Sequence, residues 1–479
     1  MSDSPSIWSG LRRLLLGKKT PPLGSPPAIL PSAEAPQTQS PQAPPTLSSQ
    51  PAPNLTSRVT TVTAPAVDLV MGIDLGTSCS KVVIGDPGWK NKSFAVSFGK
   101  ENGNISTWLR PTRFGSEANL KMRLMNDPSC NRIRDLLACY LAEVITRSRT
   151  WFEKNCPNDY SRREIRWSLN LGFPGKAVDA TPLAQAYRNI AAVAVALASH
   201  PEAPSLELAA RIRTQGVECE SFIPPARIQL YPEIAAQLAG YVNSPHKKTG
   251  NLLLIDVGAG TLDVSTIILH GNQEQDIVSF HCCEVEELGV LRLYERRKNA
   301  LENIVNGCVR YPLEHFQDGS KPAPERLSDL TQHPSRALHP AFARVSLEFS
   351  EEIVNVALSC LVRFRKSQRQ VNVSQAADPW GKNLRFFLTG GGGRSPFYTD
   401  QLAGGPLEDK LAPNYTRWNP DRARRQSIGE GLLLERLPAP RNLQNFPKEL
   451  HPHFDRLSVA YGLAYGGENL MKITSTTSQ

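Results

Sequence analysis

Two stretches of the chain share one pattern of apolar and small residues. Residues 252–269 read LLLIDVGAGTLDVSTIIL, and residues 70–84 read VMGIDLGTSCSKVVI. Each has an apolar run ending in Ile-Asp, a turn of glycine and small residues, and a second apolar run. Short apolar runs bounded by glycine turns are typical of buried strands. Because a repeated supersecondary unit reflects architecture, the pattern predicts one hairpin in each of two similar halves.

The rest of the chain alternates between strand and helix patterns. A third glycine turn, LTGGGGRSP at residues 388–396, follows an apolar strand and precedes a predicted helix. Short apolar runs predict further strands, and apolar residues at helical spacing predict helices. The predicted strands are 93–98, 165–173, 276–283 and 384–389, a strand and then a helix fill 227–242, the other predicted helices are 132–154, 181–198, 291–306, 344–368 and 457–470, and 311–340 reads as a loop.

Residues 1–66 differ from the rest in composition. Residues 21–65 are rich in Pro, Ala, Ser, Thr and Gln, which cannot bury enough apolar area to offset the entropy of ordering, so we expect a disordered tail. Within residues 6–19, basic residues lie off an apolar helical face, which predicts a helix that docks on an anionic membrane surface or in a partner's groove. The alternative is a frayed terminus with a few chance apolar residues. The apolar positions are Ile7, Trp8, Leu11, Leu14 and Leu15.

Composition narrows the class of protein. A length of 479 residues fits two or three domains, and the net charge of +9 is spread along the chain. No run interleaves aromatic with basic residues, so we expect no nucleic-acid partner. The nine cysteines form no CxxC pair and no secretory signal opens the chain, which predicts reduced thiols and a cytoplasmic location. No apolar run is long enough to span a bilayer.

The glycine turns carry the candidate chemistry. Glycine lets the backbone approach an anion closely, and successive N–H groups can bind phosphate oxygens. Asp256 and Asp263 stand at the two ends of the second turn. Carboxylates beside phosphate require a hard cation between them, and Mg²⁺ is the usual one. The alternative is that these aspartates only cap the turns, as in many glycine hairpins that bind nothing.

Three glycine turns in this order resemble the two phosphate loops and the adenosine loop of the actin, heat-shock-70 and sugar-kinase superfamily. Within it, residues 68–472 most resemble the nucleotide-binding domain of the DnaK-type 70-kDa heat-shock chaperones. The resemblance implies an α/β fold of the duplicated actin-like ATPase (ribonuclease-H-like) type. Each of its two lobes would have a mixed central sheet flanked by helices, and the lobes would enclose a nucleotide cleft. It implies a first lobe at 67–245, a second at 246–456, and a C-terminal helix at 457–472 that returns to the lobe interface.

The same resemblance implies roles for particular residues, with ATP or ADP and Mg²⁺ as ligands. Asp74 and Asp256 would bind Mg²⁺ through water, and Asp263 and Glu233 would orient the attacking water. Ala259 replaces a glycine of the family's turn, which costs roughly 1 kcal/mol if the position needs a positive φ. The implied phosphate-binding residues are Gly76, Thr77, Ser78, Cys79, Gly258, Ala259, Gly260 and Thr261, and the adenosine-binding residues are Gly390, Gly391, Gly392, Gly393 and Arg394.

A cation is also expected near the γ-phosphate. Lys81 stands seven residues after Asp74, a spacing that resembles actin, so it is the first candidate. The alternative for Lys81 is a strand-edge lysine in solvent, and the alternative for Arg394 is a surface salt bridge. In the chaperones a lysine from an inserted subdomain has this role, and Lys121 and Arg123 are nearby candidates for it.

Three functions compete on the sequence. The first is an ATP-binding, slowly hydrolysing switch similar to heat-shock-70 that acts on a protein partner by opening and closing its lobes. Few residues follow 472, so we expect no peptide-binding domain. The second is an actin-like filament-forming ATPase tethered to a membrane by the N-terminal helix. The third is a small-molecule kinase of the sugar-kinase branch, for which the sequence offers no substrate base or sugar pocket.

Overall fold

The chain divides into two compact units, Met1–Thr61 and Val62–Gln479. The first unit and the helix expected at 6–19 lie outside the described residues, so only the second is described below. The computed structural model describes residues 64–101, 104–109, 119–156, 160–174, 181–216, 221–270, 277–310, 324–371, 384–403, 407, 432–465 and 473–475.

The first sheet is built around the hairpin at residues 70–84. Its central strand β1 pairs antiparallel with β2 and parallel with β7, and the sheet order is β14-β3-β2-β1-β7-β8. Two short strands, β4 (Gly99–Glu101) and β5 (Asn104–Ser106), form a separate pair, and β6 (Trp108–Leu109) adds to β2. The strands of the path are β1 (Ala64–Leu75), β2 (Ser80–Asp86), β3 (Lys92–Ala95), β7 (Arg163–Phe173), β8 (Ile228–Pro232) and β14 (Leu443–Gln444).

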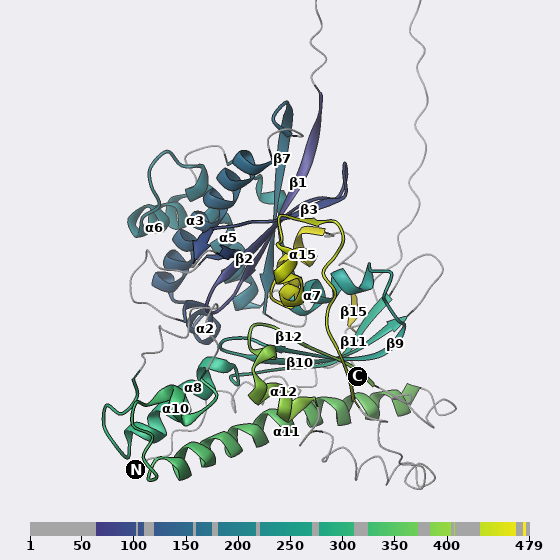
Figure 1. Cartoon of the computed structure of the whole chain (residues 1–479). Coiled ribbons are helices and arrows are strands. Elements are labelled where there is room, and N and C mark those ends of the chain that lie inside the picture. Colours follow the sequence, from purple (N-terminus) through teal and green to yellow (C-terminus); the bar gives the residue numbers. More distant parts are fainter. Residues whose placement is uncertain are drawn as a thin grey trace, which may run out of the picture. The chain divides into compact units, whose positions relative to one another are not determined.

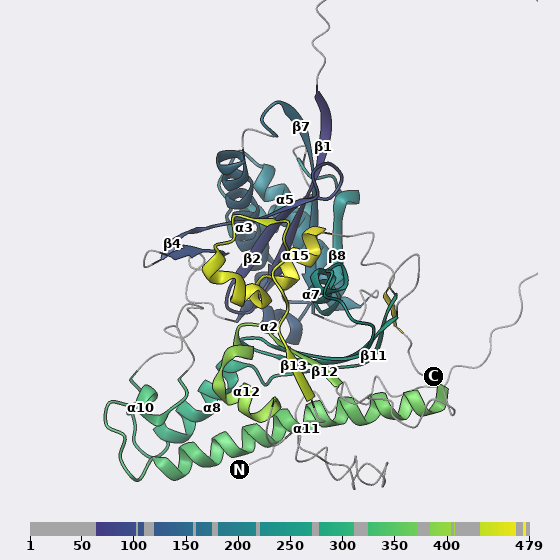
Figure 2. The same ribbon diagram turned by 45° about the vertical axis from the view of Figure 1, so that its right-hand side comes forward.

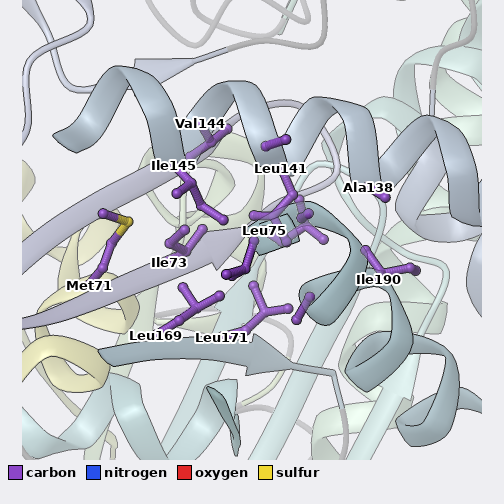
Figure 3. Packing of buried hydrophobic residues seen from close by; sticks show 14 of the residues in the cluster. Met71, Ile73, Leu75, Ala138, Leu141, Val144, Ile145, Leu169, Leu171 and Ile190 are labelled. Atoms are coloured by element: carbon purple, nitrogen blue, oxygen red, sulfur yellow. The ribbon is translucent and has the colours of Figure 1, made fainter. Parts of the chain in front are cut away.

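Helices cover this sheet because β1 and β7 are apolar runs that need partners. Figure 3 shows Ile73 of β1 and Leu169 of β7 facing Leu141 and Ile145 of α3, all fully buried. Ile190 of α5 closes the same core. The helices of the first lobe are α2 (Leu120–Asn126), α3 (Asn131–Asn155), α5 (Pro182–Ser199) and α6 (Leu206–Gln215).

The second sheet has the order β13-β12-β9-β10-β11-β15. Figures 1 and 2 show the long helix α11 along the side of this sheet away from the first lobe, with α8, α10 and α12 near its beginning. The strands are β9 (Gly250–Val257), β10 (Leu262–His270), β11 (Ile277–Glu286), β12 (Leu384–Thr389), β13 (Leu432–Glu435) and β15 (Ile473–Ser475), and the helices are α8 (Val290–Glu302), α10 (Leu327–Leu330), α11 (His339–Val371) and α12 (Pro396–Leu402).

The two sheets repeat one topology. The order β3-β2-β1-β7-β8 in the first matches β11-β10-β9-β12-β13 in the second. Within each set of five strands, the three that come first along the chain (β1–β3 and β9–β11) pair antiparallel with their neighbours. The remaining two add parallel on the other side of β1 or β9. This is the duplicated ribonuclease-H-like arrangement of an actin-like ATPase, and the predicted fold class is confirmed.

Two helices connect the lobes. α7 (Glu233–Val242) and α15 (Ser458–Tyr465) cross so closely that a methyl group on Gly462 would lie 1.8 Å from the Ala236 carbonyl oxygen. Figure 1 shows both helices between the two sheets, and Leu238 and Leu463 share a core with Leu252 of the second sheet. The connection therefore has little room for a larger residue at its crossing point.

Several elements end differently from their prediction. β14 pairs with β3, so the chain re-enters the first sheet at residue 443, before the helix that was expected to make the return. α8 ends at Glu302, and 311–340 contains the short helix α10 in its described part. The predicted helix at 457–470 is described only as far as Tyr465. No helix in the described ranges is long and apolar enough to cross a membrane.

Candidate functional site

The two repeated hairpins have the same frame. In the first, the pair Leu75 and Ser80 closes a turn of residues 76–79. In the second, Val257 and Leu262 close a turn of residues 258–261. One step further from each turn the cross-strand partners are charged: Asp74 faces Lys81, and Asp256 faces Asp263. Equal turns with charged pairs at their bases are the frame of the site.

The second turn is fixed from one side by helix α8. The Gly258 N–H donates to the Thr261 carbonyl at 2.8 Å and closes the turn. The carbonyls of residues 258–260 accept hydrogen bonds from the N–H groups of residues 289–291, which cap the beginning of α8. In the described part of the chain, the Ala259 and Thr261 N–H groups have no backbone acceptor. The turn therefore offers N–H groups to a ligand while its carbonyls are engaged.

Ala259 sits in this turn without strain. Among the described residues other than glycine, positive φ occurs only at Asn91, Asn119 and Asn445. Ala259 therefore avoids the left-handed conformation that would disfavour a residue with a side chain.

A cavity of about 370 Å³ lies between the hairpins, within the size range of small-ligand sites. All the predicted site residues line it except Gly260 and Gly393. A methyl group on Gly393 would press on Leu388 at 3.3 Å, so that residue packs into the protein instead. Gly390 is required at its place, because its φ is +76° and a methyl there would lie 2.0 Å from Asp256 Oδ1.

Lys81 points into the cavity and not into solvent. Its Nζ lies 2.8 Å from Asp74 Oδ2, and the two side chains are 16% and 10% exposed. Burial disfavours the ammonium, but the Asp74 carboxylate outweighs this and raises the pKa of Lys81. A methyl on Gly76 would lie 3.1 Å from Lys81 Nζ, so the ammonium is beside the first turn. The strand-edge alternative for Lys81 is wrong.

A second ammonium enters from α2. Lys121 Nζ donates to both carboxylate oxygens of Glu233, at 2.7 and 2.9 Å. Burial opposes the charge on Lys121, yet Glu233 raises the pKa of Lys121, while burial raises the pKa of Glu233 itself. Arg123 is exposed and does not line the cavity. Of the two nearby candidates, the structure therefore brings Lys121 to the site.

The second hairpin holds two carboxylates and no ammonium. Asp256 Oδ2 accepts a hydrogen bond from Gln237 Nε2 at 2.7 Å, and burial raises the pKa of Asp256 to about 6. Burial, with Asp256 beside it, raises the pKa of Asp263 well above its usual range. Asp263 Oδ1 is buried and has no hydrogen-bond partner in the described chain. An orphaned carboxylate oxygen beside a second carboxylate fits a cation.

That cation would need ligands beyond the protein. No group of three or more His, Cys, Asp or Glu side chains in the described ranges could hold a metal alone. Mg²⁺ keeps several waters and is commonly held by one or two carboxylates together with substrate phosphates. The aspartates at the bases of the two turns fit Mg²⁺ held jointly with a phosphate ligand.

The third glycine turn forms the far end of the cavity. Arg394, whose side chain is 26% exposed, donates to the buried Asp455, which is 2% exposed, and both line the cavity, so this is not a surface salt bridge. Asp455 comes from η3 (Lys448–Arg456), and no local pattern of residues points to it. Ser395 donates to Glu325, and both line the cavity. This end offers both polar groups and exposed glycine backbone to a ligand.

Comparisons with known proteins find similarity to solved structures and none to family models or curated sequences. No protein-family model matches the chain, and no curated protein matches it in sequence. A solved structure of MreB5 of Spiroplasma citri bound to ADP is 12% identical, with a TM-score of 0.40, over 85% of this chain and 97% of that one. A 15-stranded ParM filament from Clostridium botulinum is 12% identical, with a TM-score of 0.37, over 83% and 98%. The fold assignment stands on the matching strand orders of the two sheets.

Proposed function

We propose that this chain binds ATP with Mg²⁺ between its two hairpins and hydrolyses it slowly. One observation carries the proposal: two equal turns, facing one cavity, bring together two lysines and two carboxylates, Asp256 and Asp263, that have no salt bridge within the described ranges. Such a charge arrangement is expensive to bury without a ligand. A triphosphate with its cation supplies both the negative oxygens that the lysines attract and the positive charge that the carboxylates attract.

The phosphates would lie against the backbone N–H groups of both turns. Residues 76–79 would contact them from the first lobe and residues 258, 259 and 261 from the second. Asp74 and Asp256 would hold Mg²⁺ through water, and the bound Mg²⁺ would neutralise developing charge on the phosphate oxygens. The adenosine would lie against Gly390–Gly392, with Arg394 held in place by Asp455.

Hydrolysis would depend on positioning and charge. A water attacks the γ-phosphorus in line, and the bond from that phosphorus to the bridging oxygen breaks, giving ADP and phosphate. Asp263 and Glu233 orient this water through their carboxylates. Lys81 and Lys121 stabilise the charge on the transferred group. Because Lys121 already pairs with Glu233, the chain holds both groups in place before the nucleotide arrives.

Nucleotide-driven movement of the lobes is compatible with two functions. Lys121 reaches the cavity from a helix outside the first hairpin, which supports a switch similar to heat-shock-70 that acts on a protein partner. Lys81 lies at the spacing that resembles actin and also enters the cavity, which supports the second candidate, an actin-like filament protein. Light scattering on adding ATP separates them: it rises for a filament and stays constant for a switch.

The proposed activity is tested by what the purified protein contains and releases. Denaturing the protein and separating its small molecules by chromatography should yield ATP or ADP. Phosphate release with Mg²⁺ should be slow and independent of added sugars. No bound nucleotide and no phosphate release would refute the proposal, and sugar-dependent formation of ADP without free phosphate would favour the kinase instead.

A further inference from the structure

The two lobes touch beside the phosphate end of the cavity. A methyl group on Gly260 of the second turn would lie 3.0 Å from Met122 Sδ and 3.4 Å from Thr77 Cγ2. Met122 belongs to α2 and is 4% exposed, and Thr77 belongs to the first turn. Two residues of the first lobe therefore pack against one residue of the second. Figures 1 and 2 both show α2 at the edge of the first lobe that faces the second sheet.

This contact marks a boundary of the cavity. Gly258, Ala259 and Thr261 line the cavity, whereas Gly260 does not, because Met122 and Thr77 cover it. The residue before Met122 is Lys121, which turns toward the cavity and pairs with Glu233. Successive helical side chains point in directions about 100° apart. One short helix thus presents an ammonium to the ligand site and a thioether to the opposite turn.

We propose that Met122 is a positioning residue that closes the phosphate end of the cleft and sets the rate at which nucleotide leaves. The inference rests on the proposed function. The phosphates are enclosed by turns from opposite lobes, so release requires those turns to separate. Separation would expose the buried Met122 contact with Gly260 to water, which opposes opening. Met122 acts through the lobe contact and does not touch the reacting atoms.

The test is the dissociation rate of a fluorescent ADP analogue, chased with unlabelled ATP from the full chain in Mg²⁺. Met122→Ala should release the analogue roughly tenfold faster, because truncating a buried methionine removes both its contacts and its filled volume. Met122→Leu keeps an apolar side chain of similar volume and should release it at nearly the unaltered rate. Arg123→Ala, on the exposed side of the same helix, should leave the rate unchanged.

A second substitution tests the contact itself. Gly260→Ala adds a methyl that would lie 3.0 Å from Met122 Sδ and 3.4 Å from Thr77 Cγ2, at a residue that does not itself line the cavity. In the Met122→Ala background this methyl occupies part of the vacated space, so the double variant should release the analogue more slowly than Met122→Ala alone. A purely destabilising effect of either change would instead add to the other.

Each result has one consequence. If the unaltered chain binds no nucleotide, the proposed function fails and this inference fails with it. If the chain binds nucleotide and Met122→Ala, folded by circular dichroism, releases it at the unaltered rate, only the inference is overturned. Faster release by Arg123→Ala to the same extent would also overturn it, because the effect would then belong to α2 as a whole.

Discussion

The two hairpins have the same backbone geometry but different charges at the base of the turn. Each closes a turn of equal length and places a cross-strand pair at its base. In the first hairpin the pair is Asp74 with Lys81, which neutralise each other at 2.8 Å. In the second the pair is Asp256 with Asp263, two carboxylates side by side. The first hairpin therefore pairs its own charges, whereas the carboxylates of the second have no salt bridge among the described residues and, under the proposed function, would be neutralised by a bound cation.

This difference assigns a different energetic role to each lobe. Breaking a buried ion pair leaves an uncompensated charge and destabilises a protein, whereas removing a buried carboxylate that has no salt bridge removes its desolvation cost and its repulsion from nearby carboxylates. Substitutions at equivalent positions of the two hairpins should thus change stability in opposite directions. Under the proposed function, a bound cation and nucleotide would offset the cost of these buried carboxylates, which would couple nucleotide binding to the second lobe.

The largest expected effect is that of Lys81→Met in the first hairpin. It leaves Asp74 buried without its ammonium and should lower the free energy of unfolding by about 2–3 kcal/mol. Hydrolysis should slow by roughly 100-fold, more than ADP affinity weakens, because the charge is needed most on the transferred phosphate. Urea denaturation and phosphate release measure the two effects. Adding Asp74→Asn should restore most of the stability but not the hydrolysis. If stability is not restored, the loss does not come from leaving Asp74 without its partner.

The next effect has the opposite sign in the second hairpin. Asp256→Asn removes a buried charge while its side-chain oxygen can still accept from Gln237. Without ligand, the variant should be about 1–2 kcal/mol more stable at pH 7, less than the roughly 3 kcal/mol of the full pKa shift because the carboxylate faces an open cavity. Affinity for ATP with Mg²⁺ should fall roughly 10- to 100-fold. Thermal denaturation that shows a loss of stability would contradict the like-charge account.

The stability gain of Asp256→Asn should depend on pH. Because the pKa of Asp256 is raised to about 6 from 3.8, the folded protein binds its proton more tightly than the unfolded chain does. The unaltered protein therefore loses stability as the pH rises from about 4 through about 6, and the variant does not. Denaturation of both proteins should be measured between pH 3.5 and 7.5, in steps of about half a pH unit. Plotted against pH, the two unfolding free energies should converge at the acidic end. Parallel curves would remove Asp256 as the titrating group.

The smallest effect is expected at the turn itself. Ala259→Gly removes the methyl group of residue 259, but Ala259 already has an unstrained φ. The change should alter stability by no more than about 1 kcal/mol and nucleotide affinity by no more than about twofold. Calorimetric titration measures the affinity. A large gain would mean that the methyl group obstructs the phosphates and that the turn is less ready for a ligand than the first.

The sequence was sufficient to predict the fold and the part of the site that the glycine turns form. Apolar runs flanking glycine turns are local signals, and they located β1, β2, β9, β10 and β12 with the aspartates at the turns. Helical spacing located α3, α5 and α11. The duplicated strand order follows once two copies of the hairpin are recognised, because each copy repeats the same unit.

The sequence could not predict the pairings between distant segments, although it named Lys121, Glu233 and Arg394 as candidates. Lys121 meets Glu233 across 112 residues, and Arg394 meets Asp455 across 61. No local pattern distinguishes Lys121 from Arg123, since only tertiary packing decides which of them faces the cavity. Gln237, which fixes Asp256, reads as an ordinary helix residue. Gly260 and Gly393 were assigned to the ligand because the turn motif does not show which glycine packs inward.

The most direct test is a calorimetric titration of ATP into the chain with Mg²⁺ and again with excess EDTA. The account predicts binding that is much tighter with Mg²⁺, because the two carboxylates of the second hairpin face the phosphates only through a cation. Asp256→Asn should remove most of this dependence on Mg²⁺. Equal affinity with and without Mg²⁺, or no heat of binding under either condition, would contradict the claim that the two hairpins enclose one nucleotide with its metal.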